Sequence, residues 1–223
     1  KDVKLPEERQ TSAETLEADT LEVLADLNHA SQKGLQTIFD SSVGRSTVNH
    51  PLGGRYQITP TEASVQKLPV QHGVTTTASV MAQGFNPYVA EWSPYHGAAY
   101  AVIEATARLV AAGANWSKAR FSYQEYFERM DKQAERFGQP VSALLGSIEA
   151  QIQLGLPSIG GKDSMSGTFE ELTVPPTLVA FGVTTADSRK VLSPEFKAAG
   201  ENIYYIPGQA LAQEIDFDLI KSN

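Results

Sequence analysis

The pattern of apolar and polar positions predicts four helices. Apolar residues recur at helical spacing over Asp19–Lys33, and Gly34 is expected to end that amphipathic helix. The stretch His96–Ala112 is apolar on all sides, as in a buried helix. We expect a charged, aromatic-bearing outer helix over Phe121–Phe137. A fourth helix is expected over Pro140–Leu154, whose opening proline suits a first helical turn.

Runs of β-branched and apolar residues predict the strands. Residues 38–60 are dense in glycine, serine and proline, which predicts turns with short strands, and a loop is expected over Ala82–Tyr95. Longer strands are expected at four places: Val74–Met81, Leu156–Gly161, Thr177–Val183 and Asn202–Ile206. The second of these is expected to be buried and to end in a glycine loop. Strands and helices are mixed along the chain, so we predict an α+β fold with helices packed on a largely antiparallel sheet.

Composition and charge narrow the classes of function. The chain has 223 residues, 41% hydrophobic and 20% charged, with a net charge of −8. This balance is typical of a globular protein, and the negative charge disfavours nucleic-acid binding. No apolar run approaches the ~18 residues of a membrane helix, so no membrane partner is expected.

Residue types that are absent exclude several chemistries. The chain contains no cysteine, so it holds no disulfide, no thiolate zinc site and no cysteine nucleophile. This composition suits a reducing cytoplasm. The histidines stand apart and no GxSxG motif occurs, which argues against a zinc site and a serine hydrolase. The chain opens at Lys1 rather than at a methionine, and we expect a piece of a longer protein.

The segment from 160 to 167 is the strongest candidate for phosphate chemistry. Gly160 and Gly161 would let a backbone approach a ligand closely, and Lys162 supplies a positive charge. Hydroxyls and a carboxylate follow at Ser164, Ser166 and Asp163; the carboxylate could hold a magnesium ion that bridges phosphates. The spacing is not that of a P-loop, and a Gly-Ser turn with a solvated Lys-Asp pair is the competing interpretation.

Two further groups of residues are candidates. Glu104 and Arg108 are the ionisable residues inside the apolar stretch and lie four residues apart, so they can pair on one helix face. Either they form a structural ion pair, or Glu104 is a carboxylate of a nucleotide site. The glycine- and arginine-bearing segments 40–45 and 51–57 could contact phosphate, and exposed hairpin loops are the competing interpretation.

Taken together, these segments resemble one family. The chain resembles phosphoribosylformylglycinamidine synthase, in the second synthetase half of its long single-chain form. The resemblance runs from about Asp40 to Thr177, in the family's order and spacing. It rests on the segments DSSVGR, PLGGRYQITP, TTTASVMAQGFNP, WSPYHGAAYAVIEATARLVAAGAN and IGGKDSMSGTFEELTVPPTL, of which GGKDSMSGTF is the most specific.

The resemblance implies an activity and a domain organisation. The family converts formylglycinamide ribonucleotide, glutamine and ATP to formylglycinamidine ribonucleotide in purine biosynthesis, and the ammonia comes from a glutaminase domain. Its synthetase portion has two similar halves related by a pseudo-twofold axis. This chain resembles the N-terminal, aminoimidazole-ribonucleotide-synthetase-like domain of the second half. Residues 1–36 would then be a tail with a helix, 37–192 the domain, and 193–223 the start of the following domain.

The resemblance also implies roles for particular residues. Gly160, Gly161, Lys162, Ser164 and Ser166 match positions near nucleotide phosphate, and Glu104 and Asp163 match magnesium ligands. His72 and Arg108 stand where some relatives have an aspartate and an asparagine as further ligands. A histidine and an arginine are poor magnesium ligands. We therefore expect an auxiliary or degenerate site in this chain, which binds the family's Mg²⁺ and ATP or ADP weakly or not at all.

Other interpretations and partners remain open. The catalytic histidine is expected in the first synthetase half, so no catalytic residue is assigned here. The expected partners are that half and the glutaminase domain. An isolated piece is expected to form a homodimer through a sheet edge or face, involving Val74–Met81. The alternatives are a non-catalytic scaffold domain and a free-standing kinase-like relative of the same fold.

Overall fold

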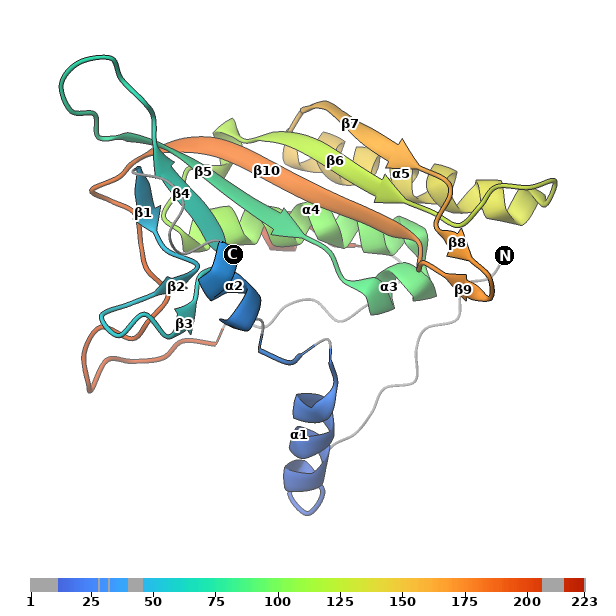
Figure 1. Ribbon diagram of the computed structural model, residues 1–223, viewed down its shortest axis with the longest axis horizontal. Coiled ribbons are helices and arrows are strands. Elements are labelled where there is room, and N and C mark those ends of the chain that lie inside the picture. Colours follow the sequence, from blue (N-terminus) through green and yellow to red (C-terminus); the bar gives the residue numbers. More distant parts are fainter. Residues whose placement is uncertain (1–11, 28, 32, 40–45, 206–214, 223) are drawn as a thin grey trace.

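A six-stranded mixed sheet forms the centre of the molecule (Figure 1). The computed structural model describes residues 12–27, 29–31, 33–39, 46–205 and 215–222. Only β6 and β7 pair in parallel within this sheet, and its other pairings are antiparallel. The strands, in their order across the sheet, are β1 (Thr47–Asn49), β4 (Ala63–Lys67), β5 (Thr77–Gly84), β10 (Thr177–Asp187), β6 (Arg120–Tyr126) and β7 (Ser158–Ser164).

Helices cover one face of this sheet. They are α3 (Pro87–Trp92), α4 (Pro94–Ala111) and α5 (Ala134–Leu154). Near the end of the chain, α6 (Phe217–Ser222) packs against α5. Alternate residues of β5, β10 and β6 are buried beneath the helices, and small side chains dominate the buried face of α4. An α+β fold with helices packed on a sheet is therefore present, as the sequence predicted, and the sheet is mixed because β6 and β7 pair in parallel.

The alanine-rich α4 lies unusually close to the sheet. A side chain at Gly84 of β5 would place its Cβ 2.1 Å from the carbonyl oxygen of Ala101. Gly97 likewise lets α4 pass the backbone of Ala90 in α3. The helix begins at an N-cap, where the Ser93 side chain accepts from the His96 N–H, and ends before Gly113, whose φ is +84°. The predicted buried helix over 96–112 is confirmed within two residues.

The N-terminal region differs from its prediction. One helix was expected over Asp19–Lys33, but α1 spans Leu16–Ala25 and α2 spans Lys33–Phe39. Gly34 lies inside α2 and ends no helix. The backbone turns to an extended conformation at Asp26, and α1 buries no residue, so packing does not prolong it. Figure 1 shows α1 standing apart from the sheet.

The predicted outer helix over Phe121–Phe137 is wrong. Residues Arg120–Tyr126 form β6, which lies between β10 and β7. Its side chains alternate between buried and exposed, the period of a strand. The helix α5 begins at Ala134 rather than at Pro140, so this proline lies within the helix.

The bounds of several other elements also differ from their predictions. β5 begins at Thr77 rather than Val74, and the expected loop over 82–95 contains the end of β5 and the whole of α3. The expected buried strand over 156–161 is β7, which lies at an exposed sheet edge. β10 contains the predicted strand and extends to Asp187. Residues 202–205 form no strand, and Ile206 lies outside the described residues.

Short elements complete the fold. Two small hairpins pair β2 (Leu52–Gly53) with β3 (Thr59–Pro60), and β8 (Thr168–Phe169) with β9 (Leu172–Thr173). A 3-10 turn spans Trp116–Lys118. No helix in the described ranges is long and apolar enough to span a bilayer. The division of the chain at 36 and 192 stays a prediction.

Candidate functional site

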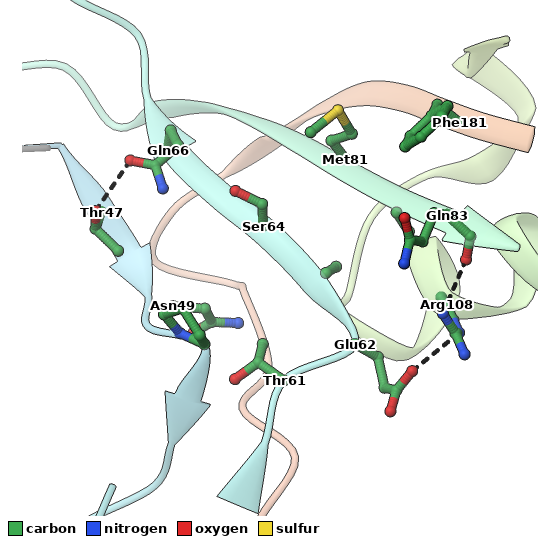
Figure 2. Close-up of a pocket in the computed structure, with 13 residues that line it drawn as sticks. Thr47, Asn49, Thr61, Glu62, Ser64, Gln66, Met81, Gln83, Arg108 and Phe181 are labelled. Atoms are coloured by element: carbon green, nitrogen blue, oxygen red, sulfur yellow. Dashed lines mark hydrogen bonds and ion pairs between the residues drawn. The ribbon is translucent and has the colours of Figure 1, made fainter. Parts of the chain in front are cut away.

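Arg108 is the centre of a polar network at the edge of the helix layer (Figure 2). Its Nη2 lies 2.7 Å from Oε1 of Glu104, one turn earlier on α4. Its Nε lies 2.9 Å from Oε2 of Glu62, just before β4. Its Nη1 donates to the carbonyl oxygen of Gln83 in β5 at 3.0 Å. One guanidinium therefore joins three separate parts of the chain.

The end of β4 explains why Arg108 reaches the sheet. β4 pairs with β5 only as far as Ala63 opposite Ala82. The Gln83 carbonyl lies one residue beyond that pairing and is free to accept from Arg108. The second carboxylate oxygen of Glu104, Oε2, accepts from the Phe85 N–H at 2.8 Å. Both oxygens of Glu104 therefore contact groups of the protein, and the expected pairing of Glu104 with Arg108 is present.

A pocket of about 770 Å³ opens beside this network. It lies over β1, β4, β5 and β10, and Figure 2 shows hydroxyl and amide side chains around it. Met81 and Phe181 supply apolar surface. Arg108 brings a positive charge to the pocket and Glu62 a negative one. The lining chemistry suits a polar ligand that accepts hydrogen bonds.

The segment predicted to bind phosphate lies on the opposite edge strand. Gly160, Gly161, Lys162 and Ser164 belong to β7 and not to a loop. Packing explains why a glycine is required at position 161, because a Cβ there would lie 2.7 Å from the Tyr123 carbonyl oxygen. The hydroxyls at positions 164 and 166 lie 3.2 Å apart. Phosphate binding by this segment stays a prediction.

The strand geometry separates Lys162 from Asp163. In the register of β7 against β6, Lys162 lies opposite Gln124 and Asp163 opposite Glu125. Successive side chains of a strand point to opposite faces. Asp163 is therefore on the face that the helices cover, and Lys162 is on the other face. The lysine and the carboxylate do not converge on one ligand from this strand.

Glu125 is a residue that sequence analysis missed, because it was placed in an outer helix. Only 7% of it is exposed. Burial raises the pKa of this carboxyl, and the neighbouring charge of Asp163 raises the pKa further. Polar and apolar residues alternate over 120–124, and one further step of this period places position 125 on the buried face. That alternation was the signal that could have identified a buried position here.

The four residues implied as ligand positions do not meet. Glu104 of α4 accepts from the Phe85 N–H just past the end of β5, whereas Asp163 belongs to β7. Strands β5, β10, β6 and β7 are consecutive neighbours, so the backbones of β5 and β7 lie about 14 Å apart. Two ligands of one magnesium ion lie within about 4 Å of each other. His72 is exposed in the loop before β5, whereas Arg108 contacts the far end of that strand.

Among the residues that the structure describes, Glu104 and Asp163 are therefore too far apart to share one magnesium ion. Within the same described part, no group of three or more histidine, aspartate or glutamate side chains could hold a metal ion. The third candidate comprises the two segments 40–45 and 51–57. Residues 40–45 lie outside the described part of the chain, and residues 51–57 contain the hairpin strand β2. Arg55 there lies over the ring of Tyr56, 5.7 Å from its centroid.

No family model and no curated protein matches the chain. Solved structures do resemble it, among them three from Thermotoga maritima. PurLQS has a TM-score of 0.60 at 19% identity, covering 74% of this chain and 25% of that one. PurL complexed with AMPPCP has a TM-score of 0.59 at 17% identity, covering 77% and 27%. Phosphoribosylformylglycinamidine synthase II has a TM-score of 0.54 at 18% identity, covering 69% and 23%.

The chain has a PurL-like fold. It spans about a quarter of the length of each of these structures. At such low identity the similarity shows the fold, and an activity does not follow from it.

Proposed function

We propose that the chain is a domain of an ATP-dependent amidotransferase that makes formylglycinamidine ribonucleotide. Two observations support this proposal. The segments that resemble the family follow one another in its order, and they lie on a fold shared with T. maritima PurL. That PurL has been solved with ATP, with ADP and with formylglycinamide ribonucleotide. In this proposal the domain belongs to the second synthetase half, and glutamine supplies the amide nitrogen.

The Arg108 network is the observation that supports an auxiliary, rather than a catalytic, role for this domain. Glu104 would be a metal ligand in a working nucleotide site, but here Arg108 neutralises it at 2.7 Å. A fixed cation beside a carboxylate makes divalent-metal binding unfavourable. Asp163, the other implied ligand with a carboxylate, lies three strands away. We infer an auxiliary site that no longer binds Mg-nucleotide and instead stabilises the domain.

A non-catalytic scaffold domain is the second candidate function. The same network favours it, because Arg108 joins α4, β5 and the start of β4 as a structural clamp. The two candidates differ in whether the complete protein turns over substrate. Sequencing the complete gene is informative, because the enzyme requires a first synthetase half and a cysteine-bearing glutaminase domain alongside this chain.

Calorimetry on the Arg108→Ala variant tests the assignment of the site. We expect the wild-type chain to show no micromolar binding of Mg-ADP. Removing Arg108 leaves Glu104 and Glu62 without their shared cation, so the free energy of unfolding should fall by about 1–3 kcal/mol. Urea titrations measure this loss.

The matched control is Arg189→Ala, which removes an exposed arginine paired with Asp187. Exposed ion pairs contribute little, so this change should cost less than about 1 kcal/mol. Micromolar binding of Mg-ADP by the wild type that is unchanged in Arg108→Ala would show that Arg108 does not replace a metal. Gain of Mg-ADP binding only in the variant would support the degenerate site.

A further inference from the structure

The outer face of α5 carries a continuous row of large apolar side chains. We call this row the α5 stripe; its members are between 41% and 69% exposed, and they are Phe137, Val141, Leu144, Leu145, Ile148 and Ile152. Glu135 is the one charged residue among the exposed positions of α5, which is described along its whole length. A solvated helix face normally carries many charges, and a large exposed apolar patch marks an interaction surface.

The opposite face of α5 fixes the helix in place. Its buried residues are small or apolar and pack against α4. Gly146 makes the closest approach, because a Cβ there would lie 2.0 Å from the carbonyl oxygen of Tyr95. The helix cannot rotate to bury the α5 stripe without breaking this contact. The stripe is therefore available to a partner.

The α5 stripe is self-complementary. Val141 lies three residues before Leu144, and Ile148 lies three residues after Leu145. Phe137 and Ile152 extend the pattern symmetrically, at seven residues before and seven after the same central pair. A twofold axis through the middle of the helix maps each of these positions onto another apolar position. Self-complementarity of this kind is what a twofold-symmetric dimer requires.

We propose that the α5 stripe is a dimerisation surface that pairs antiparallel with α5 of a second copy of this chain. If a fully exposed large apolar side chain presents about 180 Å², the stripe would bury about 550 Å² on each copy. The pair would bury about 1,100 Å², close to the ~1,000 Å² that a specific interface needs. The dimer is therefore weak and depends on concentration.

Charges are compatible with a second copy in this arrangement. The twofold axis places Glu149 of one copy opposite Pro140 of the other, and Glu135 opposite Leu154, so no two of these carboxylates meet. The exposed helix α1 would be a poorer occupant, because its charged residues, Glu17, Asp19 and Glu22, are all acidic. Arg136, the basic residue within α5, is already paired with Glu128 and Asp131. This inference does not depend on the proposed function.

Sedimentation velocity over a concentration series tests the surface. The wild-type chain should show a reversible monomer–dimer equilibrium. Leu145→Glu should raise the dissociation constant at least about tenfold, because it buries a charge at the centre of the contact. Leu172→Glu, at a 74% exposed position on β9, is the matched control and should leave the dissociation constant unchanged. Met81→Glu on the open face of the sheet should also leave it unchanged.

Single cysteines test the antiparallel geometry, and the chain has no cysteine of its own. Packed helices lie about 8–10 Å apart, which brings facing Cα atoms within disulfide range. Leu145→Cys should therefore crosslink to itself on oxidation. Phe137→Cys and Ile152→Cys should each remain uncrosslinked alone, because their copies are about 22 Å apart along the axis, and should crosslink when mixed.

Four results would overturn the proposal. A strict monomer at every concentration would mean that the stripe binds another segment or a different partner. A dimer that survives Leu145→Glu, or one that Met81→Glu dissociates, would place the interface elsewhere. Self-crosslinking of Phe137→Cys would show that the helices are not antiparallel. Circular dichroism confirms that each variant is folded.

Discussion

At the scale of single residues, Glu125 shows how strongly a strand position sets the chemistry of a side chain. Burial and the charge of Asp163 raise the pKa of its carboxyl above the ordinary 4.5. The folded protein therefore holds this proton more tightly than the unfolded chain does. The resulting stability is complete below pH 4.5 and is lost as the pH rises through the raised pKa. Glu125 thus opposes folding at neutral pH.

The raised pKa of Glu125 gives a testable prediction. Glu125→Gln should differ little from wild type below pH 4.5 and should become progressively more stable than wild type as the pH rises to neutrality. Urea unfolding at several pH values measures the difference. Glu171→Gln removes the same charge from an exposed position and serves as the control. A difference between Glu125→Gln and wild type that does not change with pH would refute the raised pKa.

At the scale of elements, the contact of α4 with β5 depends on Gly84. Its Cβ would clash with the Ala101 carbonyl oxygen at 2.1 Å, which is backbone and cannot turn aside. We expect Gly84→Ala to lower the free energy of unfolding by at least about 1–3 kcal/mol, because strand and helix must separate. Gly138→Ala is the control in α5, where a Cβ meets nothing within 4 Å. It should be neutral or stabilise by about 0.5–1 kcal/mol, and chemical denaturation compares the two. Equal effects would contradict the close packing.

At the scale of the whole molecule, the sheet has a helix-covered face and a face that carries the pocket beside Arg108. β5 lies between β4 and β10, so both of its edges are already paired. A second copy could contact this strand only through the open face of the sheet. The expected homodimer through Val74–Met81 stays a prediction, and its interface would have to be that face. The dimer that we infer through α5 uses the other side of the molecule.

The chain alone should not make formylglycinamidine ribonucleotide. It spans about a quarter of the PurL structures it resembles and has no cysteine for a glutaminase. A coupled assay with ATP, ammonia and formylglycinamide ribonucleotide should show no turnover above a control without enzyme. Turnover by the purified chain would contradict both the proposed degenerate site and the expected need for the first half.

The sequence by itself determined the features that depend on neighbours along the chain. The helix over 96–112 was predictable because a run of residues that is apolar on all sides favours a buried helix whatever distant segments pack on it. The pairing of Glu104 with Arg108 was predictable because residues four apart on a helix are adjacent. The α+β class followed from the mixture of periodicities.

Only the tertiary structure decided features that join distant segments. The segment over 120–126 became β6 because β10 and β7 lie on either side of it, and hydrogen bonds to both outweigh local helix preference. Glu62 joined Arg108 because β4 ends one residue short of Gln83. Lys162 and Asp163, adjacent in sequence, were separated because a strand sends successive side chains to opposite faces. Candidate ligands that are adjacent in the sequence can therefore lie on opposite faces of the sheet, and only the tertiary structure shows which of them share a face.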